Sequence, residues 1–329
     1  MKSLQLKTSL TDAELNRLIK RLAVVLVLGA IAFGAFYTLD RWRPATPTIV
    51  DQEIATLESA VRADPNDIAV RGQLADTYLA KGRFADALTQ YDLIIGTGTN
   101  LEPAHMGRAQ ALVGLNRLDE AAKDYEAVVD IAKGGEMAVV DPTLEAAYYG
   151  LGSIALKQSR PADAVNWLQA ALAIKRSDAD AIYLLGTAYI ATGDLDKAIT
   201  ELRASTAFVP VGWSEPYVAM ADAYTRQGKA ELAAWATAMA DLNAGRADAA
   251  LTRLKTLTEG PAALDAAVGL GLLYETRGEN AAAVDWYTKA LALDPTNNAA
   301  RLGLGRVGPI GTGAPSAGPA SPAPSEGAR

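Results

Sequence analysis

The most apolar stretch of the chain lies near its N-terminus. Residues 22–39 read LAVVLVLGAIAFGAFYTL, eighteen residues without a charged side chain. A helix of that length reaches about 27 Å, which is enough to cross the hydrocarbon core of a bilayer. Tyr37 and Trp42 lie where aromatic rings favour the membrane interface, and Arg41 and Arg43 close the run. The pattern predicts a transmembrane helix over residues 22–39.

A cleaved signal peptide is the main alternative, because Ala30, Ala32 and Ala35 would suit a cleavage site. The leading arm of 21 residues and an apolar run longer than the usual about 7–15 residues favour a retained anchor. More basic side chains precede the run than follow it. The positive-inside rule therefore predicts a cytoplasmic arm, with the body of the chain on the extracytoplasmic, periplasmic side of the inner membrane. A body in the cytoplasm stays open as the opposite orientation.

Beyond residue 50 the chain carries short amphipathic helical patterns in units of 34 residues. Two apolar stripes of helical period recur in each unit, and neither stripe is able to bury its face alone. Three segments repeat the same spacing of tyrosine, glycine, alanine and a large apolar residue: Tyr78-x3-Gly82-x4-Ala87-x3-Tyr91, Tyr189-x3-Gly193-x4-Ala198-x3-Leu202 and Tyr274-x3-Gly278-x4-Ala283-x3-Tyr287. Ala75, Gly186 and Gly271 place a small residue three positions before each tyrosine.

These spacings resemble the tetratricopeptide repeat (TPR) family, whose 34-residue pattern contains a small residue, an aromatic, a turn glycine, an alanine and a terminal proline. Pro210 and Pro295 supply that proline in two units. The resemblance implies an all-α fold, a right-handed solenoid of helix pairs. The expected parts are a basic arm (1–21), the span (22–39), a linker (40–49), the solenoid (50–306) with units near 68–101, 102–135, 145–178, 179–212, 214–247 and 264–297, and a disordered Gly/Pro/Ala/Ser tail (307–329).

Three irregularities interrupt the repeat. In the second unit Asn116 stands where the turn glycine is expected, and nine extra residues, 136–144, separate the second and third units. Gly228 and Gly245 both suit turns, yet they are only 17 residues apart, half of one unit. The helix 230–243 must then serve two successive pairs, which predicts a change of phase near residue 245.

Charge and composition exclude several functions. Residues 1–43 carry seven basic and three acidic side chains, and the rest of the chain carries 24 basic and 35 acidic ones. An acidic body lacks the basic surface needed for nucleic acid. The chain has no cysteine and a single histidine, His105, so we expect no metal and no cofactor. No carboxylate or nucleophile obviously frames His105, which we interpret as a packing residue.

Catalytic motifs are also missing from the sequence. Gly150-x-Gly152, Gly269-x-Gly271 and Gly303-x-Gly305 only weakly resemble a nucleotide-binding fingerprint, and they fall inside the repeats rather than after a strand. We therefore interpret these glycines as helix-packing positions and expect the protein not to be an enzyme.

If the chain performs no chemistry, its function lies in the groove that the first helices of TPR pairs line. Carried onto this sequence, the family's ligand-contacting positions favour a set of apolar, aromatic and polar residues: Asp76, Leu79, Met106, Gln110, Val113, Tyr149, Ser153, Leu156, Tyr183, Thr187, Ile190 and Asp222. The groove positions include only Lys157 and Arg226 as basic residues, so an acidic tail is a poor ligand. An apolar or weakly basic protein segment fits better.

The combination of a short arm, one span and an external repeat array is similar to bacterial cell-envelope TPR proteins. It implies a membrane-tethered scaffold or chaperone-like factor for complex assembly, bound to the lipid bilayer through residues 22–39. The alternative is a permanent structural subunit of a membrane complex. Ala30-x3-Gly34 would permit close contact of the span with another helix.

Overall fold

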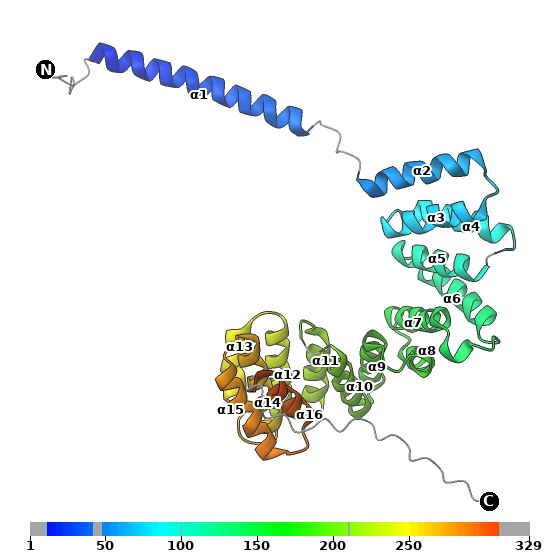
Figure 1. Ribbon diagram of the computed structural model, residues 1–329, viewed down its shortest axis with the longest axis vertical. Helices are drawn as coiled ribbons and strands as arrows, with labels where there is room; N and C mark the ends of the chain where they lie inside the picture. The colour runs from blue at the N-terminus through cyan, green and yellow to red at the C-terminus, as the bar shows by residue number, and fades with distance from the viewer. Residues whose placement is uncertain (1–11, 42–47, 100, 210, 309–329) are drawn as a thin grey trace, which may run out of the picture. The chain divides into compact units, whose positions relative to one another are not determined.

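The computed structural model describes residues 12–41, 48–99, 101–209 and 211–308, and within these ranges every regular element is helical (Figure 1). The all-α expectation is confirmed. Two compact units divide the chain, residues 1–64 and residues 65–329. The start of the predicted arm, most of the linker and the tail from residue 309 lie outside the described residues.

The first unit contains α1 (Asp12–Arg41) and α2 (Ile49–Ala63). Within α1, the 22 residues from Asn16 to Tyr37 are long and apolar enough to cross a membrane, and none of that surface is buried. The side chains of Leu26 and Phe33 are 74% and 70% exposed. Apolar surface in contact with water costs free energy, and a bilayer would remove that cost. A signal sequence near an N-terminus passes the same test of length and composition.

The second unit contains α3 to α16. Their bounds are α3 (Ile68–Ala80), α4 (Phe84–Gly96), α5 (Leu101–Gly114), α6 (Leu118–Ala132), a 3₁₀ turn η1 (Ala138–Val140), α7 (Pro142–Lys157), α8 (Pro161–Ile174), α9 (Ala179–Thr192), α10 (Leu195–Phe208), α11 (Glu215–Arg226), α12 (Ala230–Asn243), α13 (Ala247–Lys255), α14 (Ala263–Thr276), α15 (Asn280–Leu293) and α16 (Asn298–Val307). Each helix packs against the next one along the chain.

Seven turns in the described chain are built alike. The residue after each turn residue donates its N–H to the carbonyl five positions earlier, as Arg83 does to Tyr78 at 2.8 Å and Glu279 does to Tyr274 at 2.9 Å. The turn residue has a positive φ, and five of the seven are glycines. Asn116 (φ 58°) and Ser159 (φ 56°) take the same conformation in the second and third pairs. The missing glycines therefore did not abolish the turns, although non-glycine residues adopt this conformation less readily.

Glycines inside the helices allow close approach between them. A Cβ atom at Gly152 would lie 2.6 Å from Cγ of Leu168, and one at Gly186 would lie 2.7 Å from Cγ of Leu202. Gly150 faces the ring of Tyr125 in the same way. A real Cβ does not fit at these distances, so each glycine forms the hole for a large buried side chain. The interpretation of Gly150 and Gly152 as packing positions is confirmed.

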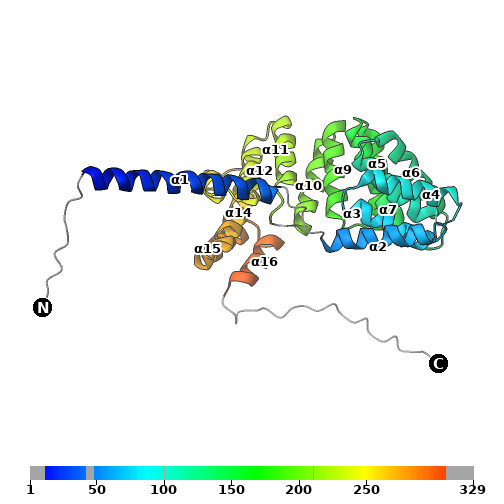
Figure 2. The ribbon, with the colours of Figure 1, turned by 90° about the horizontal axis from the view of Figure 1, so that it is seen from above.

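The order of helix contacts changes at α12. Up to that point first helices touch first helices, in the pairs α3 with α5, α7 with α9, and α9 with α11. Beyond it the contacts join α12 with α14 and α14 with α16. In both Figure 1 and Figure 2, α12 lies next to α11 and α14. The helix α12 is thus the second helix of the pair that α11 begins, and it also contacts α13 and α14 in the position of a first helix.

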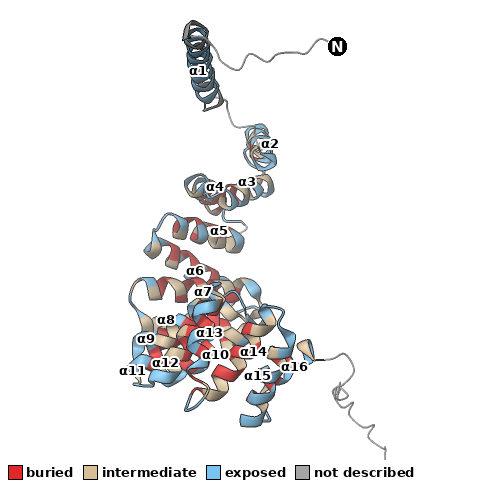
Figure 3. Ribbon diagram, turned by 90° about the vertical axis from the view of Figure 1, so that its left-hand side faces the viewer, coloured by how far each residue is buried: buried red, intermediate tan, exposed pale blue. Residues whose placement is uncertain are grey.

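The core runs along the inner faces of the second unit. One cluster of buried side chains extends from α7 to α14, another joins α5, α6 and α7, and a third joins α14, α15 and α16. Figure 3 shows these buried faces in red, with exposed residues on the outer faces of the same helices. Alanine is the commonest core residue, because it lets the helix backbones approach closely.

Candidate protein-binding surface

The predicted groove residues all lie on the first helices of the pairs. They are Asp76 and Leu79 on α3, Met106, Gln110 and Val113 on α5, Tyr149, Ser153 and Leu156 on α7, Tyr183, Thr187 and Ile190 on α9, and Asp222 on α11. Three of these residues are exposed, Asp76, Gln110 and Asp222, whereas Ile190 is buried and the other eight are half-buried. The exposure of the predicted groove residues therefore ranges from exposed polar side chains to a side chain buried in the core.

Several of the apolar positions serve packing as well as surface. Ile190 belongs to the core cluster and is 8% exposed, so it offers little to a partner. Tyr149, Leu156 and Tyr183 pack against the same cluster. The ring of Tyr183 also meets Trp213 edge-on, with centroids 5.3 Å apart. Truncation of these tyrosines would cost stability as well as contact area, a cost that sequence reasoning did not foresee.

A cavity of about 200 Å³ opens between α3, α4 and α5. Ala69, Gly72 and Asp76 line it from α3, and Tyr91 and Pro103 line it from α4 and α5. The Tyr91 hydroxyl donates to Oδ1 of Asp76 at 2.6 Å. Burial, and secondarily this bond, raises the pKa of Tyr91, so the phenol stays neutral and fixes the carboxylate. The cavity combines small apolar walls with one oriented negative charge.

The polar residues of this surface differ in how they are held. Asp222 pairs with Arg226 across one helical turn of α11 at 2.8 Å, and both side chains are about half exposed. Such an exposed pair contributes little to stability and exchanges partners readily. Gln110 projects from α5 as an exposed amide. These positions are open to a partner, in contrast to the half-buried tyrosines.

The sequence-based view of His105 needs correction, because a carboxylate does frame it. Nδ1 of His105 lies 2.7 Å from Oδ1 of Asp124, a buried side chain of α6. Arg108 donates to both oxygens of Asp124, at 2.6 and 2.8 Å, and to Asp92 of α4 at 2.8 Å. The cluster ties α4, α5 and α6 together. Among the described residues, no nucleophilic side chain belongs to these contacts, and the two pairs of Arg108 with Asp124 and Asp92 are ionic.

Sequence reasoning missed a second ionic contact, between Arg203 of α10 and Asp265 of α14. The guanidinium donates to both carboxylate oxygens, at 3.0 and 2.8 Å, although the two residues are 62 positions apart. Trp235 donates its Nε1–H to the backbone carbonyl of Asp265 at 3.1 Å. Burial opposes the charge of Arg203, but the pair with Asp265 outweighs it and raises the Arg203 pKa. These residues line a cavity of about 420 Å³ that α16 also borders.

Solved structures that resemble this chain include TPR proteins. The C-terminal part of a TPR repeat-containing protein from Cytophaga hutchinsonii is 18% identical, with a TM-score of 0.50, over 78% of this chain and 94% of its own. YrrB, described as a TPR protein with an unusual peptide-binding site, is 21% identical, with a TM-score of 0.48, over 60% and 97% of the two chains. MamA is 23% identical, with a TM-score of 0.47, over 53% and 90%. At these identities the likeness concerns the fold alone.

Family comparison places the repeats along the sequence. Models described as tetratricopeptide repeat match residues 54–100, 103–134, 155–211 and 236–298, which together span more than half of the chain. No curated protein matches the chain. The matched segments contain six of the seven repeated turns and the packing residue Gly186; the turn at Gly228 and the glycines Gly150 and Gly152 lie between them. The chain therefore belongs to the tetratricopeptide repeat family.

Proposed function

We propose that the chain is a membrane-tethered scaffold or assembly factor that holds client segments against the first helices of its repeats. TPR arrays are protein-interaction modules, and their stacked helix pairs present extended binding surfaces. The observation that carries the proposal is the cavity between α3 and α5. It lies on the predicted groove face, and Tyr91 holds the carboxylate of Asp76 inside it.

The charge of this face supports an apolar or weakly basic client. Asp76 and Asp222 are exposed there, and Arg226 is already paired with Asp222. The chain beyond residue 43 carries 35 acidic and 24 basic residues, so an acidic segment would be repelled. Half-buried Met106, Val113 and other apolar groove residues supply the contact area that a client's apolar side chains need.

We expect a photo-crosslinking residue at Gln110 to capture a client at the groove, whereas the same residue at Thr200 captures none. Gln110 is exposed on a first helix, and Thr200 is also exposed, on the second helix α10. The measurement is ultraviolet crosslinking in intact cells, followed by mass spectrometry. Asp222→Lys should weaken capture severalfold with little loss of stability, because its partner Arg226 is solvent-exposed. Equal capture from Gln110 and Thr200, or capture unaffected by Asp222→Lys, would refute the groove assignment.

The membrane part of the proposal has its own test. We expect the full chain to resist extraction by alkaline carbonate, because the 22-residue segment Asn16–Tyr37 of α1 is apolar enough to cross a membrane and is exposed in the protein alone. Protease added to intact spheroplasts should remove the repeats and leave a fragment that carries the N-terminal arm. Protection of the repeats would place them in the cytoplasm. A soluble protein that starts after residue 30 would instead identify α1 as a cleaved signal sequence.

The alternative role, a permanent subunit of a membrane complex, rests on the surface of α1. Ala30-x3-Gly34 is a small-xxx-small spacing, which would permit close contact with another transmembrane helix. Co-purification at a fixed stoichiometry after mild detergent would favour this role. Substoichiometric, transient capture would favour the assembly factor.

A further inference from the structure

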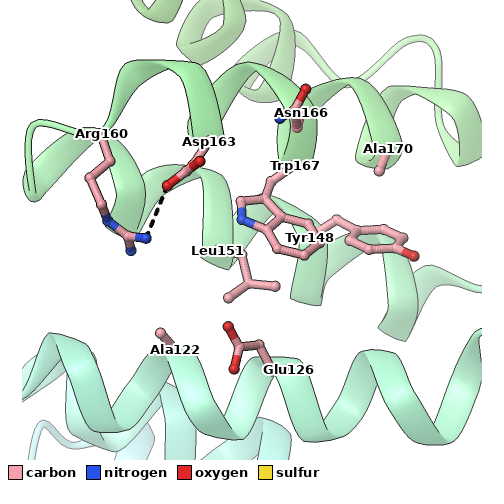
Figure 4. A pocket seen from close by; sticks show the side chains of 9 residues that line it. All are labelled: Ala122, Glu126, Tyr148, Leu151, Arg160, Asp163, Asn166, Trp167 and Ala170. Carbon is pink, nitrogen blue, oxygen red and sulfur yellow. Dashed lines mark hydrogen bonds and ion pairs between the residues drawn. The ribbon is translucent and has the colours of Figure 1, made fainter.

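A third pocket lies between the second helices α6 and α8, away from the predicted groove residues (Figure 4). Its volume is about 450 Å³. Tyr148 of α7 and Trp167 of α8 stack in it with ring centroids 5.9 Å apart and planes inclined by 22°. Leu151, which is buried, forms the floor beside the indole. The pocket therefore has one flat aromatic wall.

A carboxylate faces this aromatic wall. Figure 4 shows Glu126 of α6 with its oxygens directed into the space between α6 and α8. Within the described chain, Glu126 is exposed and has no hydrogen-bond or ion-pair partner. The other acid of the pocket, Asp163, is already paired with Arg160 at 3.1 Å. The charged residues of the lining thus leave one negative charge uncompensated.

At the same pair of positions, the two preceding repeats have a polar contact instead of an aromatic pair. In the first repeat Arg71 donates to Gln90 at 2.6 Å, and in the second His105 meets Asp124. Each of these pairs is 19 residues apart, as are Tyr148 and Trp167. The aromatic pair is stacked rather than joined by a polar bond, and the pocket that it borders, about 450 Å³, is larger than the pocket of about 260 Å³ at the corresponding place of the second repeat.

We infer that this pocket binds an arginine side chain of a partner protein. The guanidinium would lie flat on the ring of Trp167 and donate to the carboxylate of Glu126. A planar cation suits both contacts, because guanidinium stacks on aromatic faces and binds carboxylates with two donors. Lysine offers only a compact charge, and an anion would face Glu126 and Asp163. The charge of the lining therefore selects a cation, and the flat wall selects arginine.

The surroundings indicate what flanks the arginine. The insertion after α6 exposes Met137, Val139 and Val140, which are 67%, 75% and 58% exposed. Its Ala138 packs on the same core cluster as Tyr148 and Trp167, and η1 packs against α8. An apolar surface therefore lies close to the pocket. The partner segment should carry apolar residues beside its arginine.

The test uses the full chain in detergent micelles, with its five tryptophans replaced by 5-fluorotryptophan. Trp167→Phe serves only to assign the fluorine signal of Trp167. The probes are the peptides Ac-Leu-Arg-Leu-NH₂ and Ac-Leu-citrulline-Leu-NH₂, which differ in charge but hardly in shape. We expect the arginine peptide to shift the Trp167 signal saturably, and the citrulline peptide to shift it at least about tenfold more weakly.

Variants separate the pocket from general electrostatics. Glu126→Gln should raise the Kd of the arginine peptide about tenfold, because it removes the charge from one acceptor and keeps its shape. Glu259→Gln removes the same charge at an exposed position outside the pocket and should leave the Kd unchanged. Circular dichroism checks that both variants fold. An unmoved Trp167 signal, equal shifts with the two peptides, or equal Kd values for Glu126→Gln and the unchanged protein would overturn the inference.

Discussion

Replacing Tyr287 by alanine is expected to lower the free energy of unfolding of the C-terminal repeats by about 3–5 kcal/mol. Tyr287 is 1% exposed, and its ring occupies the space left by two glycines. A Cβ atom at Gly271 would lie 2.5 Å from this ring, and one at Gly303 would also overlap it. The hydroxyl donates to Glu275 at 2.6 Å, and Glu275 in turn accepts from Arg306 of α16. Alanine would leave a cavity where α14, α15 and α16 meet.

Urea denaturation followed by circular dichroism measures this loss, and hydrogen exchange of α14 to α16 locates it. Tyr287→Phe is the matched control, since it keeps the ring and removes only the hydrogen bond, at a cost of about 1 kcal/mol. Burial and the bond to Glu275 raise the pKa of Tyr287, so its contribution is present below the ordinary value of 10 and fades as pH rises above it. A Tyr287→Ala protein as stable as Tyr287→Phe would contradict the packing role.

Asp124→Ala is expected to destabilise the second repeat by about 3 kcal/mol. The side chain of Asp124 is buried, and it accepts from Arg108 while it also contacts His105. The hydrogen bond to Asp124 is the chief cause of the raised pKa of Arg108. Without this carboxylate, a guanidinium that is three-quarters buried keeps only Asp92, which lies at the surface. The loss reflects the unpaired cation more than the lost bond itself.

A double-mutant cycle tests that explanation by thermal or urea unfolding. Arg108→Met combined with Asp124→Leu should be less harmful than Asp124→Ala alone, because no buried charge remains unpaired. Asp130→Ala on the same helix is the surface control, and it should cost less than about 0.5 kcal/mol because its pair with Lys133 is exposed. Additive effects at Arg108 and Asp124 would show that the cluster is not a coupled unit.

The repeat architecture can be predicted from the sequence because the residues that determine it lie close together along the chain. A small residue such as Gly186 marks where a neighbouring helix approaches, and a glycine such as Gly193 marks the turn. Asn116 and Ser159 adopt the same positive-φ turn conformation without being glycine. The second and third repeats, which lack the turn glycine, therefore still form helix pairs. Packing between the helix faces holds these turns in place.

Side-chain partners were harder to predict, for two different reasons. His105 and Asp124 are one of several pairs spaced by 19 residues across a helix hairpin, a regularity that comparison of the repeats reveals. Arg203 and Asp265 have no such signal, because their contact depends on the change of helix order at α12. The sequence predicted that groove residues such as Tyr149 lie on the first helices. The exposure of the Tyr149 side chain, however, depends on how neighbouring helix pairs pack.

The shared helix α12 also alters how the array yields to mechanical load. In a regular solenoid each pair touches only its neighbours, so the stack is able to peel apart one hairpin at a time. Here α12 touches α11, α13 and α14, and the Arg203–Asp265 clamp reaches from α10 to α14. A pull on the C-terminal end cannot release α14 without also breaking that clamp. The helices from α10 to α14 should consequently rupture together, as one mechanical block rather than one hairpin at a time.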